Sequence, residues 1–135
     1  ETEIAGGRVA ITCVSMGNPH CVVFGDDPDG LRLEEIGPKF ENAPIFPDRT
    51  NTEFVRVLGR NELKMRVWER GSGETLACGT GACAAAAAAV ENGFADMDAD
   101  VTVHLKGGDL TVRRTAETIF MTGTATLVFS GEVAL

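Results

Sequence analysis

The alanine-rich segment between residues 79 and 92 constrains the fold of this chain most strongly. Residues 84–89 are six consecutive alanines, and alanine has the highest helix propensity of all residues. Residues 79–92, at a rise of about 1.5 Å each, predict a helix of about 20 Å that ends at Gly93 as its C-cap. Because alanine side chains are short, strands can approach such a helix from every side. The segment therefore predicts a buried central helix.

Short apolar segments separated by turn residues predict that the remainder is mostly strand. Two strand pairs are expected: residues 8–15 with 21–24 around the turn MGNPH, and residues 53–58 with 63–68 around GRNE. Further strands are expected at residues 101–105, 110–113, 119–121 and 126–129, and a short helix at residues 31–36 that ends at the following Gly-Pro. One long helix among mostly antiparallel strands predicts an α+β domain rather than alternating βαβ units.

Length and charge exclude several functional classes. The 135 residues are enough for one domain with a core and too few for two ordinary domains. A net charge of -8, with acids scattered along the chain, repels phosphate, so no nucleic acid and no anionic membrane is expected as a partner. The opening ETEIAGG lacks the features of a secretory signal, and the weakly apolar residues 76–90 are fewer than the roughly 18 that a membrane span needs. We expect a cytoplasmic protein.

The cysteines are expected to be free thiols. A domain of this size does not require disulfides, and Cys13 and Cys21 lie in apolar, strand-like segments. The chain has no C-x-x-C pair, and His20 and His104 are not spaced as partners. We therefore expect no metal site.

The segment ACGTGA in front of the alanines has three interpretations. The first is a dinucleotide-binding fingerprint, because Gly79-x-Gly81-x-x-Ala84 fits G-x-G-x-x-A and acids follow at about the expected distance, at Asp96, Asp98 and Asp100. The elements that follow resemble hairpins, however, and this disfavours the fingerprint. The second is a buried cysteine with a purely structural role.

The third interpretation is a reactive thiolate at Cys78. A helix N-terminus offers unpaired N–H groups and a partial positive charge, and both stabilise an anion. Such a position lowers a thiol pKa from about 8.5 towards neutrality. Gly79 and Gly81 leave room for a substrate carboxylate to reach the same N–H groups.

Three motifs together resemble the C-terminal half of bacterial diaminopimelate epimerases. They are MGNPHCVVF (residues 16–24), RTNTEFV (residues 49–55) and WERGSGETLACGTGACA (residues 68–84), and their order and spacing also match the family. The resemblance extends to the closing FSGEVAL. It implies a fold of two similar halves, each a barrel-like sheet around a central helix, with the active site between them. Proline racemases and phenazine-biosynthesis isomerases are more distant relatives of that fold.

The resemblance implies a cofactor-free inversion of an α-carbon that interconverts LL- and meso-diaminopimelate, a precursor of lysine and peptidoglycan. One cysteine thiolate removes the α-proton, and a second cysteine on the opposite face delivers a proton. Two such acid–base groups need pKa values near the working pH and a dry pocket rich in donors. Cys78 matches one of the two cysteines, and the N–H groups of Gly79 and Thr80 match the site of the α-carboxylate.

Further site residues follow from the same motifs. Asn18 and Asn51 match residues that bind the distal end of the substrate, and Arg70 matches the partner of the distal carboxylate. Glu69 matches a partner for an ammonium group or a residue that tunes the cysteines, and His20 matches a histidine close to the reacting centre. Each also has an ordinary structural interpretation; Asn18 before a proline, for instance, is a common turn residue.

The chain departs from the family pattern in one respect. A complete enzyme carries another cysteine, in a motif like CGNG, in an N-terminal half, and this sequence has no such motif. Cys83 cannot replace it, because five residues at about 100° each turn it away from Cys78 on the helix. We expect residues 1–135 to be the C-terminal domain alone, inactive by itself, with an apolar face that meets the missing half or drives self-association, including a homodimer.

Two alternative functions remain open at this point. One is a non-catalytic domain of the same fold that binds a small ligand or a partner. The other is an isomerase related to proline racemases, although two amino-acid-binding ends favour diaminopimelate over proline.

Overall fold

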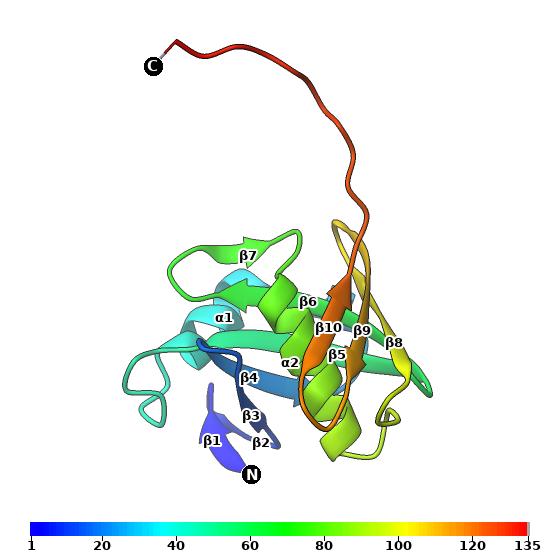
Figure 1. Ribbon diagram of the computed structural model, residues 1–135. Coiled ribbons are helices and arrows are strands. Elements are labelled where there is room, and N and C mark those ends of the chain that lie inside the picture. Colours follow the sequence, from blue (N-terminus) through cyan, green and yellow to red (C-terminus); the bar gives the residue numbers. More distant parts are fainter. Residues whose placement is uncertain (135) are drawn as a thin grey trace.

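Helix α2 (Gly79–Glu91) lies against the inner side of a curled sheet in a computed structural model that describes residues 1–134 (Figure 1). All six alanines of residues 84–89 are buried. Gly93, at a φ of 77°, ends the helix as predicted. The Gly93 N–H donates to the Val90 carbonyl, and the Phe94 N–H donates to the Ala89 carbonyl, as in a Schellman motif. The prediction of a buried central helix is confirmed.

The main sheet runs in the order β10-β9-β8-β6-β5-β4-β3, and β7 pairs with β6 outside this path. Strands β4 and β5 are parallel, as are β6 and β8, and the other pairs are antiparallel. The predicted α+β class is confirmed. The strands span Thr12–Ser15 (β3), Pro19–Phe24 (β4), Asn51–Gly59 (β5), Glu62–Glu69 (β6), Gly73–Thr75 (β7), Asp100–Leu105 (β8), Gly108–Arg114 (β9) and Ile119–Thr122 (β10).

The sheet separates two apolar cores. Helix α2 packs with inward-facing residues such as Leu63 and Val101 in the larger core. The smaller core lies beneath α1 (Leu33–Glu41) and contains Phe40 and Phe54, whose rings meet edge to face at 5.2 Å. The remaining elements are the β-hairpin of β1 (Thr2–Ile4) with β2 (Gly7–Val9) and the 3-10 helix η1 (Pro28–Gly30).

Two local predictions were wrong in their bounds. The single strand expected at residues 8–15 is divided between β2 and β3. The helix expected to stop before Gly-Pro instead continues to Glu41 with Pro38 inside it. Tertiary contacts explain this, because Phe40 is buried in the smaller core and Gly37 packs on the indole of Trp68. A Cβ at Gly37 would lie 2.2 Å from Trp68 Cδ2.

The strand expected at residues 126–129 does not form. Residues 123–134 carry no regular structure and leave the body of the domain after β10 (Figure 1). Their apolar side chains are more than four-fifths exposed, at Leu127, Val128, Phe129 and Val133. A strand requires a neighbour to pair its N–H and C=O groups, and residues 1–122 offer this segment none.

The described residues also bear on the expected partners. No helix among them is long and apolar enough to cross a membrane. Within residues 1–134, no cluster of three or more histidines, cysteines and carboxylates could hold a metal ion. All four cysteines are free thiols, as predicted.

Candidate active site

The predicted site residues come from four segments that meet at one end of the sheet. His20 in β4 is the register partner of Asn51 in β5, and Thr52 in β5 is the partner of Trp68 in β6. The starts of β4 and β5 therefore lie beside the end of β6, where Glu69 is the last residue. The first turn of α2 reaches the same end, as the hydrogen bond between Asn18 and Thr80 demonstrates.

Cys78 occupies the N-cap position of α2. Its extended backbone (φ -136°, ψ 110°) aims the side chain back over the first turn, where Sγ accepts the Gly81 N–H at 3.3 Å. The Thr80 hydroxyl lies 3.6 Å from the same sulfur. Within residues 1–134, the N–H groups of Gly79 and Thr80 have no acceptor, as is common for the first turn of a helix. The sulfur thus lies among donors.

The expectation that this position lowers the thiol pKa is wrong for the chain as described. Burial raises the pKa of Cys78, and the hydrogen bonds from Thr80 and Gly81 offset only part of that rise. Only 8% of Cys78 is exposed, so the desolvation of a thiolate outweighs the donors at the helix start. Cys13 is the exposed cysteine. Exposure alone therefore favours Cys13 over Cys78 for alkylation.

A chain of hydrogen bonds leads from the thiol into the sheet. The Asn18 Nδ2 group donates to Thr80 Oγ1 at 3.3 Å, and Asn18 Oδ1 lies 3.1 Å from His20 Nε2. The other ring nitrogen, His20 Nδ1, lies 2.6 Å from Glu53 Oε1. Both the His20 and the Glu53 side chains are fully buried. Asn18, His20 and Thr80, which were predicted separately, thus form one connected unit with Cys78.

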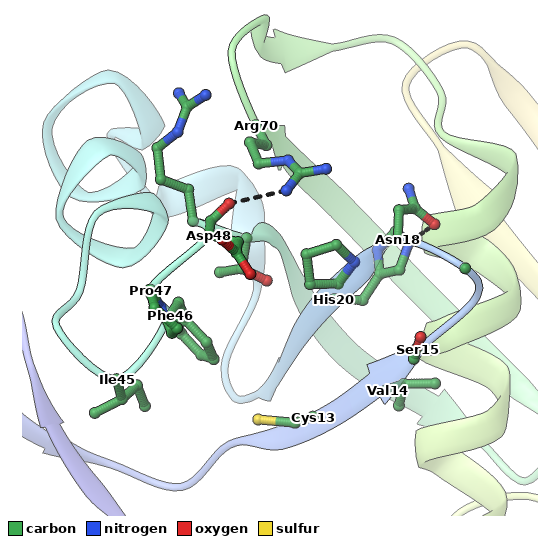
Figure 2. A pocket seen from close by; sticks show the side chains of 14 residues that line it. Cys13, Val14, Ser15, Asn18, His20, Ile45, Phe46, Pro47, Asp48 and Arg70 are labelled. Atoms are coloured by element: carbon green, nitrogen blue, oxygen red, sulfur yellow. Dashed lines mark hydrogen bonds between the residues drawn. The ribbon is translucent and has the colours of Figure 1, made fainter.

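An open cavity of about 840 Å³ lies beside this unit. Arg70 and Asn18 both line it (Figure 2). The Arg70 guanidinium donates through Nη1 to the Asp48 carbonyl at 2.8 Å, drawn as a dashed line between Arg70 and Asp48 in Figure 2. The cavity wall consists of the residue 45–50 loop, the start of β4 and β3. Cys78, Gly79 and Thr80 do not line it, so the site has a thiol part and a cavity part with Asn18 between them.

Asn51 is buried and engaged at both ends of its amide. Its Nδ2 donates to the Pro19 carbonyl at 2.9 Å, and its Oδ1 accepts the Arg70 N–H at 2.8 Å. Asn51 therefore ties the start of β4 to the residue that follows β6. Asn51 thus links the three motifs that carry the predicted site residues.

Glu69 accepts the hydroxyl of Thr75 in β7 and makes no hydrogen bond to this unit within residues 1–134, but its charge, in addition to burial, raises the pKa of both Cys78 and Glu53. The backbone beside it is held by Glu41, at the end of α1. Glu41 accepts the Gly71 N–H at 2.9 Å and the Trp68 indole N–H at 2.8 Å. This buried carboxylate fixes the turn between β6 and β7.

Sequence reasoning missed Glu53, which belongs to the hydrogen-bonded unit, and Glu41, which supports the neighbouring turn between β6 and β7. Glu53 lies within RTNTEFV, where all five residues from Asn51 to Val55 are buried. The available signal was an acidic residue inside an apolar strand, since a carboxylate is seldom buried without a partner. Glu41 carries no such signal, because its helix was expected to end before it. Cys83 is half-buried and packs against the larger core, as expected for a residue inside the helix.

The model of the family described as diaminopimelate epimerase matches residues 12–128. A diaminopimelate epimerase of Agathobacter rectalis is 62% identical over 91% of this chain, which covers 43% of that protein. A diaminopimelate epimerase of Synechocystis sp. is 57% identical over 98% of this chain and is covered to 47%. The chain thus spans about half the length of the curated relatives it matches.

Solved structures support the fold. A phenazine biosynthesis protein of the PhzF family from Bacillus anthracis matches 78% of this chain with a TM-score of 0.54 and 27% identity, and 34% of that protein is covered. A PhzF-family protein from Enterococcus faecalis has a TM-score of 0.55 over 82% of this chain and 41% of its own, at 18% identity. The second likeness bears on the fold alone.

Proposed function

The chain belongs to the diaminopimelate epimerase family, and we propose that it supplies one half of an active site that inverts an α-carbon of diaminopimelate. The observation that carries the proposal is the environment of Cys78. Its sulfur lies among donors at the start of a buried helix, beside two N–H groups that have no acceptor within residues 1–134. These groups suit a substrate carboxylate next to a thiol.

In the proposed reaction, the bond between the α-carbon and its hydrogen breaks as a thiolate takes the proton. The electron pair delocalises into the adjacent carboxylate, which the N–H groups of Gly79 and Thr80 stabilise. A thiol on the opposite face then releases its proton to the α-carbon, and the inverted centre forms. No cofactor enters this scheme.

Burial keeps the pKa of Cys78 above its ordinary value, so this thiol retains its proton at neutral pH. We therefore assign Cys78 the role of proton donor when the reaction starts, and the missing half supplies the thiolate. The roles reverse for the opposite isomer, since the same bonds break and form in the other order. A missing half that adds cationic or donor groups to the site would move the pKa of Cys78 towards the working range.

The cavity beside Asn18 suits the distal end of the substrate. Arg70 is half-exposed there, and its planar guanidinium can bind a carboxylate through two parallel hydrogen bonds. Asn51 acts by holding the Arg70 backbone. Glu69 remains a candidate partner for an ammonium group, and His20 acts close to the reacting centre through Asn18.

The N-terminal half of the same enzyme is the proposed partner. The chain matches only about half of its relatives, and several large apolar side chains lie open to solvent, at Leu76, Phe120, Met121, Leu127 and Phe129. Exposed apolar side chains of this kind suit a protein interface, to another domain or a second copy. Four free thiols favour a reducing compartment such as the cytoplasm.

Isotope exchange and stereochemistry test the proposal together. The purified chain in heavy water should neither exchange the α-hydrogen at a measurable turnover rate nor invert LL-diaminopimelate. Addition of the separately expressed N-terminal half should restore both activities. In the combined protein, Cys78→Ser should abolish inversion and Cys83→Ser should retain it. Equal turnover of proline, or inversion that survives Cys78→Ser, would contradict the assignment.

A further inference from the structure

Glu53 is a buried acid with no part in the reaction as proposed above. Its Oε1 contacts His20, whereas its Oε2 has no hydrogen-bond partner within residues 1–134. Buried carboxylates with a purely structural role normally have both oxygens satisfied. Glu41 illustrates this in the same chain, since its two oxygens accept from Trp68, Gly71 and Arg49. The half-satisfied Glu53 therefore requires a separate explanation.

The carboxylate of Glu53 also lies directly below the first turn of α2. A Cβ at Gly81 would stand 2.8 Å from Glu53 Oε1 and 3.1 Å from Cys78 Sγ. Only a residue without a side chain lets the carboxylate and the thiol approach the same turn of the helix. Glu53 thus contributes to the surroundings of Cys78 both by direct proximity and through His20.

The hydrogen bonds between Glu53 and Cys78 have a defined direction. Asn18 Oδ1 can only accept, so His20 Nε2 carries a proton and donates it. The 2.6 Å contact between His20 Nδ1 and Glu53 Oε1 needs one further proton, which the two groups share. Because Asn18 donates through Nδ2 to Thr80, the Thr80 hydroxyl keeps its own proton for the sulfur of Cys78.

We infer that Glu53 is a positioning residue for the Cys78 thiol. By holding the second proton of His20, Glu53 orients the hydrogen bonds that run through Asn18 and Thr80, so that each donor points towards Cys78. A charge-assisted donor is stronger than a neutral one, and hydrogen bonds in a chain strengthen each other. Without the carboxylate, His20 is neutral and keeps its single proton on Nε2, which donates more weakly to Asn18. The consequence for catalysis rests on the proposed function, but the arrangement itself does not.

Replacement of Glu53 by glutamine tests the inference in residues 1–135 alone, without the N-terminal half. The variant is isosteric, and it removes a carboxylate whose charge, in addition to burial, raises the pKa of Cys78. Loss of that charge alone would speed the alkylation of Cys78, so slower alkylation identifies an effect transmitted by the hydrogen bonds. Two signals are measured: the Nδ1 proton of His20 by nitrogen-15 NMR, and the alkylation rate of Cys78 by site-resolved mass spectrometry. Circular dichroism verifies that each variant is folded.

Glu53→Gln should lose the shared Nδ1 proton signal and slow the alkylation of Cys78 about fivefold, the factor that one hydrogen bond of ordinary strength is worth. Asn18→Ala interrupts the same series of hydrogen bonds between His20 and Thr80. It should slow the alkylation of Cys78 to a similar extent and keep the Nδ1 proton signal of His20. Glu41→Gln removes the other buried carboxylate and should change neither measurement. The alkylation rate of Cys83 should stay constant in all three.

Three results would overturn the inference. Glu53→Gln could keep the Nδ1 signal, or lose it while Cys78 reacts at the original rate. Glu41→Gln could slow Cys78 as much as Glu53→Gln, which would indicate general loosening. Because neither signal requires turnover, a failure of epimerisation after addition of the N-terminal half would refute only the proposed function. If epimerisation is restored, Glu53→Gln should lower kcat about fivefold and leave KM unchanged, as expected for a residue that acts on the thiol.

Discussion

Glu41 and Glu53 are both buried, yet the protein treats the two carboxylates in opposite ways. Glu41, at the end of α1, is bonded to Arg49, Trp68 and Gly71. Burial alone would raise its pKa, but these hydrogen bonds outweigh burial and leave the pKa below its usual value. Glu53, beneath α2, has one partner and one unsatisfied oxygen, and burial raises its pKa.

The difference separates a structural carboxylate from one whose role lies beyond stability. Glu41 meets a donor at every side and fixes the turn between β6 and β7. Glu53 retains a buried oxygen that lowers stability, because an unpaired polar atom in the interior loses its bonds to water. Burial is common to both residues, so the satisfaction of hydrogen bonds distinguishes them.

The largest expected effect is on the free energy of unfolding. Glu41→Gln should cost about 2 kcal/mol, because the amide nitrogen cannot accept a hydrogen bond and leaves either the Trp68 indole N–H or the Gly71 N–H without its acceptor. Glu53→Gln should cost less than about 1 kcal/mol, since it removes an ionisable group that is poorly satisfied. Urea unfolding followed by circular dichroism measures both values. Glu34→Gln, exposed on the same helix as Glu41, serves as the control, and equal costs for the two buried sites would erase the contrast.

Gly81→Ala should destabilise the protein by about 1–2 kcal/mol. The new Cβ would stand 2.8 Å from Glu53 Oε1, and this overlap outweighs the roughly 1 kcal/mol by which alanine favours a helix. Gly79→Ala is the matched control in the same turn, because its Cβ would meet only the flexible end of Met121, at 3.1 Å. Thermal unfolding midpoints compare the two, and a larger loss in Gly79→Ala would show that Glu53 is free to move.

Acidification should change the contributions of Glu41 and Glu53 to the free energy of unfolding in opposite directions. The pKa of Glu41 lies below its unfolded value of 4.5, so its stabilisation is present above that value and is lost as the pH falls through the folded pKa. The difference in stability between wild type and Glu41→Gln should therefore narrow in acid. The pKa of Glu53 is raised, so the wild type should gain stability relative to Glu53→Gln as the pH falls towards 4.5. Urea unfolding at several values between about pH 7 and pH 3 measures both trends. Changes of the same sign for Glu41→Gln and Glu53→Gln would contradict the comparison.

The smallest effect concerns the neighbour of Glu53. The Thr52 hydroxyl is buried without a hydrogen-bond partner within residues 1–134, so Thr52→Val should leave stability unchanged or raise it by up to about 1 kcal/mol. Thr102→Val, at a half-buried hydroxyl on β8, should bring no such gain. Destabilisation by more than about 1 kcal/mol in Thr52→Val would reveal a partner for that hydroxyl, and Glu53 would be the first group to re-examine.

Several features were predictable from the chain because their causes are local. Six alanines in a row favour helix whatever surrounds them, and Gly93 can adopt the positive φ that ends it. The hairpin of β5 and β6 follows from period-two alternation around a polar turn. Cys78 at the helix start could likewise be identified, since its position depends only on where the alanine helix begins.

Other features depend on partners distant in sequence, so local reasoning missed them. Helix α1 passes through Pro38 because Phe40 and Gly37 have contacts in the smaller core. Residues 126–129 have the composition of a strand but no neighbour with which to pair. The pKa of Cys78 rises rather than falls because the surrounding sheet desolvates the thiol, an effect that the position at a helix start does not reveal.

The sequence by itself determined the α+β class and the central helix, since propensity and periodicity are properties of short segments, and its resemblance to a family indicated Asn18, His20 and Thr80 as neighbours of Cys78. Only the tertiary structure decided how those residues are connected. The parallel pairing of β4 with β5 brings His20 to Glu53, 33 positions away, and the packing of α2 brings Asn18 to Thr80, 62 positions away. Hydrogen bonds over such separations depend on strand register and helix packing, which the whole core sets together.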